Sequence, residues 1–130
     1  MNPIPITLTI FGIPNCDTVK KARAWLSEHG VAHAFVDFKK QGVDDAALAR
    51  WLAQLGWQAL LNTRGTTWRR LDDAARAAVT DAASAQALML AQPSVIKRPV
   101  VAWPDGSVSA GFEPSAWQAR LDRGTAAGVA

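Results

Sequence analysis

The stretch that decides the fold is Ile10-Phe11-Gly12-Ile13-Pro14-Asn15-Cys16-Asp17-Thr18-Val19-Lys20-Lys21, which places the only cysteine where an apolar strand passes into a helix. Gly12 and Pro14 are typical of the end of a strand. Asn15 is a suitable N-cap, and the spacing of the apolar residues that follow predicts a helix from Cys16 to about His29. We therefore expect the sulfur at the N-terminus of a helix.

The composition of the chain limits the classes of protein to which it can belong. The chain has 130 residues, of which 49% are hydrophobic, so it can form one core and we expect one compact domain. Its formal net charge is +3, but lysine and arginine alternate with acidic residues and form no long basic block. This pattern favours a small anion over nucleic acid as the ligand.

The N-terminal region has no basic segment followed by a long apolar run, and no uncharged stretch approaches the ~20 residues of a membrane span. A single cysteine cannot form an internal disulfide, which suits a reducing compartment. We expect a soluble, cytoplasmic protein without a membrane partner. His29 and His33 flank a glycine that ends a helix and have no cysteine beside them, which is weak evidence for a metal, so we predict no metal site, and we predict no bound cofactor.

The remaining hydrophobic patterns predict an α/β fold in which a strand, helix and strand precede a helical insertion at about 44–92, and a strand, strand and helix follow it. Strands are predicted at 4–11, 34–38, 96–103 and 108–112. Helices are predicted at 16–29, 46–55, 57–61, 71–78, 81–91 and 115–121, with a loop at 62–67 and a frayed, flexible tail at 124–130. A parallel opening unit followed by a hairpin indicates a small mixed sheet.

Cys16 has two interpretations. At a helix N-terminus, free N–H groups and the helix dipole stabilise a thiolate, and Lys20, four residues on, adds a cation, while Asp17 acts in the opposite sense. Alternatively, the cysteine is a small buried hydrophobe. The coincidence of strand, turn and helix start favours a reactive sulfur.

Two arginines are candidates for binding an anion. Arg64 lies in a polar loop rich in threonine and glycine, and Arg98 directly precedes Pro99. From these features an anion-binding role and an ordinary surface role are equally open. Lys97, Arg69 and Arg70 are interpreted as plain solvated charge, and the tryptophans as mostly core residues.

Three segments resemble the ArsC/Spx family of thioredoxin-fold proteins, and within it the YffB-like branch. The segments are residues 12–22, 61–69 and 96–100, and the similarity extends from about Leu8 to Leu121. The resemblance implies a thioredoxin-like fold with a helical insertion. It also implies that Pro99 is a cis-proline facing Cys16.

The resemblance further implies an activity. In the arsenate reductases of this family a cysteine thiolate attacks arsenate, glutathione resolves the adduct to a mixed disulfide, and glutaredoxin reduces that disulfide. The arginines that hold the oxyanion in these reductases match Arg64 and Arg98.

The sequence also departs from the family pattern at three positions. Phe112 replaces a third arginine, Gly12 replaces a histidine, and Val19 replaces a serine. Val19 also stands where the Spx regulators, which bind RNA polymerase, carry the second cysteine of a Cys-x-x-Cys pair. These differences weaken the case for arsenate more than the case for glutathione, whose carboxylates need less binding machinery.

We therefore expect a glutathione-dependent thiol reductase in which Cys16 is the catalytic nucleophile. Arg64, Arg98, Pro99 and Lys20 are the predicted anion-binding or glutathione-binding residues. Glutathione is the predicted co-substrate and a glutaredoxin a possible partner. The alternatives are a glutathione- and glutaredoxin-coupled arsenate reductase and a non-enzymatic regulator that binds RNA polymerase.

Overall fold

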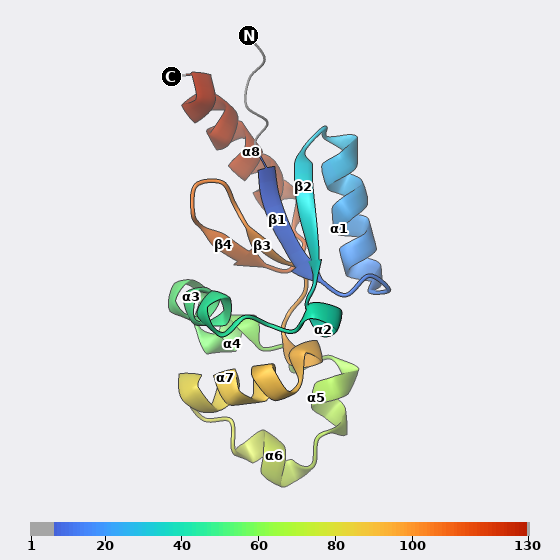
Figure 1. Cartoon of the computed structure of the whole chain (residues 1–130), viewed down its shortest axis with the longest axis vertical. Helices are drawn as coiled ribbons and strands as arrows, with labels where there is room; N and C mark the ends of the chain where they lie inside the picture. Colours follow the sequence, from blue (N-terminus) through green and yellow to red (C-terminus); the bar gives the residue numbers. More distant parts are fainter. Residues whose placement is uncertain (1–6, 130) are drawn as a thin grey trace.

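A four-stranded mixed sheet forms the centre of the molecule (Figure 1). The computed structural model describes the backbone of residues 7–129, so the predicted start of the first strand at residues 4–6 lies outside the described residues. The strands are β1 (Thr7–Gly12), β2 (Ala32–Asp37), β3 (Val100–Ala102) and β4 (Val108–Ala110), in the order β2-β1-β3-β4. β1 is parallel to β2 and antiparallel to β3, which is antiparallel to β4. The predicted mixed sheet is confirmed.

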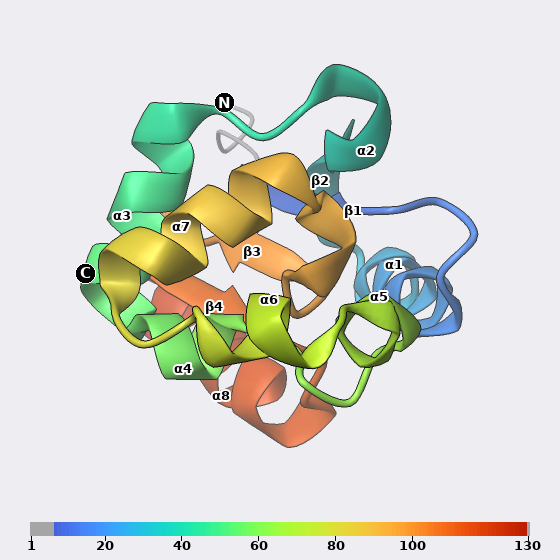
Figure 2. The same ribbon diagram turned by 90° about the horizontal axis from the view of Figure 1, so that it is seen from below.

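Helices surround this sheet in two groups. The first group is α1 (Asp17–Glu28) and α8 (Pro114–Val129), which lie beside the strands. The second group follows β2 and is gathered at one end of the sheet (Figure 1), where Figure 2 shows it from below. It begins at Phe38, before the helical insertion predicted at about 44–92. Its members are α2 (Phe38–Gln41), α3 (Asp45–Leu55), α4 (Trp57–Leu60), α5 (Thr66–Arg70), α6 (Asp73–Ala77), α7 (Ala82–Ala91) and a 3₁₀ turn at Pro93–Val95.

The alternation of side chains along the strands divides the core into two clusters. Successive strand residues point to opposite faces, so Leu8 and Ile10 face α1 and α8 whereas Phe11 faces the insertion. On the first face Trp117 of α8 is fully buried against the sheet. The sheet is therefore covered on both faces, which fixes the register of β1.

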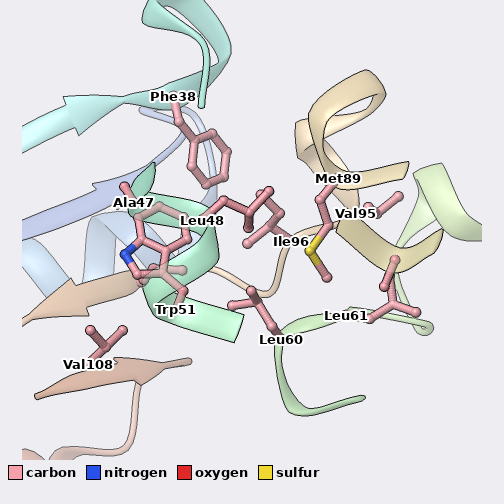
Figure 3. Packing of buried hydrophobic residues seen from close by; sticks show 12 residues of the cluster. Phe38, Ala47, Leu48, Trp51, Leu60, Leu61, Met89, Val95, Ile96 and Val108 are labelled. Atoms are coloured by element: carbon pink, nitrogen blue, oxygen red, sulfur yellow. The ribbon is translucent and has the colours of Figure 1, made fainter. Parts of the chain in front are cut away.

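The insertion has its own apolar packing, which joins it to the sheet (Figure 3). Trp51 of α3 packs edge-on against Phe11 of β1, with ring centroids 4.9 Å apart. Met89 of α7 and Ile96 are completely buried in the same cluster. This packing anchors the segment that leads from α7 back into β3.

That returning segment differs from the prediction. The predicted strand at 96–103 is wrong in its first half, because only Val100–Ala102 pairs in the sheet. Ile96 instead forms an isolated antiparallel bridge with Leu61. Pro99 has no N–H to donate to a ladder, so the sheet begins after it.

Other boundaries are also shifted. β2 begins two residues earlier than predicted and ends before Phe38, because the Asp37 carboxylate accepts from the N–H groups of Lys39 and Lys40 and caps α2. β4 ends at Ala110, since Gly111 turns the chain with φ of 87°.

Two helix predictions are corrected as well. α5 begins at Thr66, inside the predicted loop. The predicted end of the last helix at Leu121 is wrong, since α8 continues as helix to Val129, through most of the segment predicted as a frayed tail; Ala130 lies outside the described residues.

Candidate active site

Cys16 is the N-cap of α1, at the end of the turn that follows β1. Its N–H donates to the carbonyl oxygen of Ile13 at 3.2 Å, and its carbonyl oxygen accepts from the Lys20 N–H at 2.9 Å. The prediction of Asn15 as the N-cap is wrong, because the first helical hydrogen bond belongs to Cys16. The N–H groups of the first turn have no acceptor within the helix and lie at its positive end. Cys16 is half-buried and thus lies directly before a helix of 12 residues.

Cys16 also lines an open depression of about 320 Å³, which we call the Cys16 depression. The residues that form it come from four separate parts of the chain. They are Cys16, Thr18, Asn62, Lys97, Arg98, Gly111 and Phe112. The three sequence segments of the resemblance therefore each contribute to the same site.

Arg98 is the predicted anion-binding residue that the structure brings to Cys16. Its side chain is half-buried, and its Nη1 donates to the carbonyl oxygen of Ser94 at 3.1 Å. The peptide bond between Arg98 and Pro99 is cis, and the carbonyl oxygen of buried Pro99 accepts from the Gly111 N–H at 2.9 Å. Hydrogen bonds thus hold both the side chain of Arg98 and the backbone of the residue that follows it.

Two other residues predicted to bind an anion lie outside the Cys16 depression. Arg64 and Lys20 are exposed and, among the described residues, are not part of the lining of the Cys16 depression. Arg64 is nevertheless on the same loop as Asn62, whose Oδ1 accepts from the Arg64 N–H at 3.0 Å. Asn62 itself lines the depression, so this loop forms part of its rim.

Lys97 lines the depression, although its sequence pattern predicts only solvated charge. Its position directly before Arg98 in the third segment was the available signal. The side chain lies close to Gly111: a Cβ atom added to that glycine would be 3.0 Å from Lys97 Cε. Sequence alone does not reveal this contact, because it joins two distant segments.

Phe112 forms the apolar wall of the depression. Its ring packs edge-on against Trp117 with centroids 4.8 Å apart, and against Trp25 at 6.4 Å. Where the resemblance places a third arginine, this chain therefore has an aromatic side chain that packs against the core residues of α1 and α8.

Comparison with known proteins identifies the relationship. The family model described as the ArsC family matches residues 11–120. The chain belongs to the ArsC family. The solved structure of a protein named YffB is 52% identical, with a TM-score of 0.80 over 86% of this chain and 96% of that one. An arsenate reductase (ArsC) related protein from Brucella melitensis is 48% identical, with a TM-score of 0.72 over 92% of this chain and 98% of that one.

A more distant relative is a global transcriptional regulator, Spx of Streptococcus pyogenes, which is 28% identical over 72% of this chain and 70% of its own length. These similarities establish the predicted thioredoxin-like ArsC fold. Membership of the ArsC family supports a thiol-based reductase or arsenate reductase class. Between residues 7 and 129, no helix is both long and apolar enough to cross a membrane.

Proposed function

We propose that this ArsC-family protein is a glutathione-dependent thiol reductase in which Cys16 is the nucleophile. The observation that carries the proposal is the Cys16 depression, where the cysteine shares an open surface with the cationic residues Lys97 and Arg98. A thiol nucleophile needs access to its substrate, and an anionic co-substrate needs cations beside it. The depression provides both features.

The reaction has two thiol–disulfide exchange steps. The Cys16 thiolate attacks one sulfur of a disulfide that contains glutathione, forms a mixed disulfide with the glutathionyl group and releases the other sulfur as a thiolate. A second glutathione thiolate then attacks the glutathione sulfur of that mixed disulfide, which yields oxidised glutathione and restores the Cys16 thiolate. The chain has one cysteine, so the second thiol must come from another molecule, either glutathione or a glutaredoxin.

The surrounding residues have distinct roles in this proposal. Arg98, held by the Ser94 carbonyl, binds a carboxylate of the glutathionyl group. The peptide before Pro99 lines the groove for the glutathione backbone. Arg64, exposed on the rim loop beside Asn62, adds a weaker positive charge at the edge of the site, and Lys20 adds a more distant one.

Intact-mass measurement after incubation with oxidised glutathione tests the proposal. The wild-type protein should gain the mass of one glutathionyl group, and reduced glutathione should remove it. Cys16→Ser should gain nothing under the same conditions. An unmodified wild-type protein throughout the neutral pH range would refute the proposed function.

Arsenate reduction is the second candidate, favoured by the similarity to an arsenate reductase related protein. We expect little or no arsenate turnover, because Phe112 supplies an apolar wall where the resemblance places a cation. Arsenate-dependent oxidation of glutathione, coupled through glutaredoxin, measures this activity.

The similarity to Spx supports a third candidate, a non-enzymatic regulator that binds RNA polymerase. In that case polymerase subunits should be retained by the protein in a pull-down experiment, and retention should be unaffected by Cys16→Ser. Loss of retention in that variant, or no retention at all, would instead favour the redox function.

A further inference from the structure

The backbone of Lys97 is fixed in the wall of the Cys16 depression. Its N–H donates to the carbonyl oxygen of Leu60 at 2.8 Å, and the preceding residue, Ile96, is completely buried. The cis peptide bond between Arg98 and Pro99 follows directly. Lys97 thus extends from an anchored segment and not from a loose surface loop.

Its side chain is directed by a glycine of the hairpin. A Cβ atom on Gly111 would lie 3.0 Å from Lys97 Cε and 3.6 Å from Lys97 Nζ. The end of the lysine side chain therefore lies close to the position where any other residue would carry its Cβ atom. Gly111 is buried and has φ of 87°, a conformation that other residues rarely adopt. The glycine therefore provides the space that lets the ammonium group lie in the depression.

The charge of the depression has one sign. Among the described residues that line it, Lys97 and Arg98 are the charged ones, and none is a carboxylate. In the described part of the chain, Lys97 also has no ion-pair partner; the ion pair found there joins Arg76 and Asp73. Both cations are thus available to a ligand.

We propose that Lys97 determines the substrate specificity of this site by selecting disulfides that carry carboxylates over neutral ones. The proposal rests on the proposed function and names a residue that neither the sequence pattern nor the family resemblance assigns. Oxidised glutathione carries more carboxylates than ammonium groups, so it satisfies this selection. Arg98 is held by the Ser94 carbonyl, whereas the ammonium of Lys97 lies beside Gly111 without an ion-pair partner in the described part of the chain, so it can adjust to the bound carboxylate.

The experiment compares two disulfides on the intact protein. Rate constants for modification of Cys16 are measured by mass spectrometry with oxidised glutathione and with the neutral bis(2-hydroxyethyl) disulfide, at low ionic strength. The ratio of the two constants isolates charge selection, because any general change in the reactivity of the sulfur affects both. Lys97 is exposed but lines the depression, so for Lys97→Ala we expect this ratio to fall about two- to fivefold, the range for an ion pair of an exposed side chain.

Three controls separate selection from a structural effect. Lys97→Arg should keep the ratio, and Lys40→Ala, which removes an exposed lysine of α2, should leave it unchanged. Added salt should lower the ratio for the wild type and have little effect on Lys97→Ala. An equal ratio in the wild type and Lys97→Ala would overturn the inference while leaving the thiol reductase function intact. Failure of both disulfides to modify Cys16 would instead refute the proposed function, and the inference with it.

Discussion

A Cβ atom on Gly12 would lie 2.7 Å from Cγ2 of Val19. Gly12 is the last residue of β1 and Val19 belongs to the first turn of α1. The Val19 side chain thus lies in the space beside Gly12, across the turn that carries Cys16. Val19 is completely buried, and its β-branched side chain has little freedom to rotate away. The two departures from the arsenate reductase pattern at these positions are therefore physically coupled.

Gly12→Ala should destabilise the protein by about 1–3 kcal/mol through overpacking against Val19. The φ angle of Gly12 is not positive, so backbone strain does not contribute. The free energy of unfolding from urea denaturation measures the effect.

Val19→Ala provides the matched second variant. Alone this substitution should lower the free energy of unfolding by about 2 kcal/mol, because buried apolar surface is lost. Combined with Gly12→Ala, the total loss should be smaller than the sum of the single losses by about 1 kcal/mol, because the cavity accepts the new methyl group. Strict additivity would show that the two positions do not compete for the same space.

Arg98→Ala should slow modification of Cys16 by oxidised glutathione about tenfold, because it removes a positioned cation from the Cys16 depression. Arg64→Ala should change the rate by about twofold or less, since Arg64 is exposed and does not line the Cys16 depression. The same mass-spectrometric rate measurement compares them. An equal loss in both variants would show that Arg64 contacts the ligand as closely as Arg98.

Much of the fold was predictable because local patterns and tertiary structure agree. The alternation through Leu8 and Ile10 predicted β1, and the spacing of Leu48 and Trp51 predicted α3. The third strand was overestimated, because Ile96 is as apolar as a sheet residue but pairs with Leu61 outside the sheet. Only the folded insertion determines that pairing.

The candidate site was predictable in part for the same reason. Cys16 was recognisable because the strand, turn and helix around it are contiguous in sequence. Lys97 was not recognisable as a site residue, because the direction of its side chain depends on the Leu60 carbonyl, which binds its N–H, and on the open space at Gly111. Both belong to other segments of the chain.

The N-terminus of α7 should make folding stability depend on acid pH. The N–H and hydroxyl groups of Ser84 donate to the Asp81 carboxylate and hold the pKa of Asp81 below its usual value. A lowered pKa in the folded state stabilises the protein above the unfolded value of about 4, and this contribution is lost as pH falls through the lower, folded value. Hydrogen bonds from Ser107 lower the pKa of Asp105 in the same way.

Asp81→Asn tests this dependence, because asparagine is also a good N-cap but does not titrate. Unfolding free energies should differ between wild type and variant at neutral pH, and this difference should shrink as the pH is lowered below about 4. A difference that stays constant over this range would show that the carboxylate charge does not contribute.

Phe112→Arg should change both stability and substrate choice, because Phe112 joins the wall of the Cys16 depression to the aromatic core. Loss of the edge contact with Trp117 should cost about 0.5–1.5 kcal/mol beyond lost burial. A third cation at the depression should raise the preference of Cys16 for oxidised glutathione over the neutral disulfide by about two- to fivefold. Phe112→Leu, which keeps an apolar wall, should lose stability without changing that preference. If both variants shift the preference equally, the shape of the wall controls substrate choice and the added charge does not.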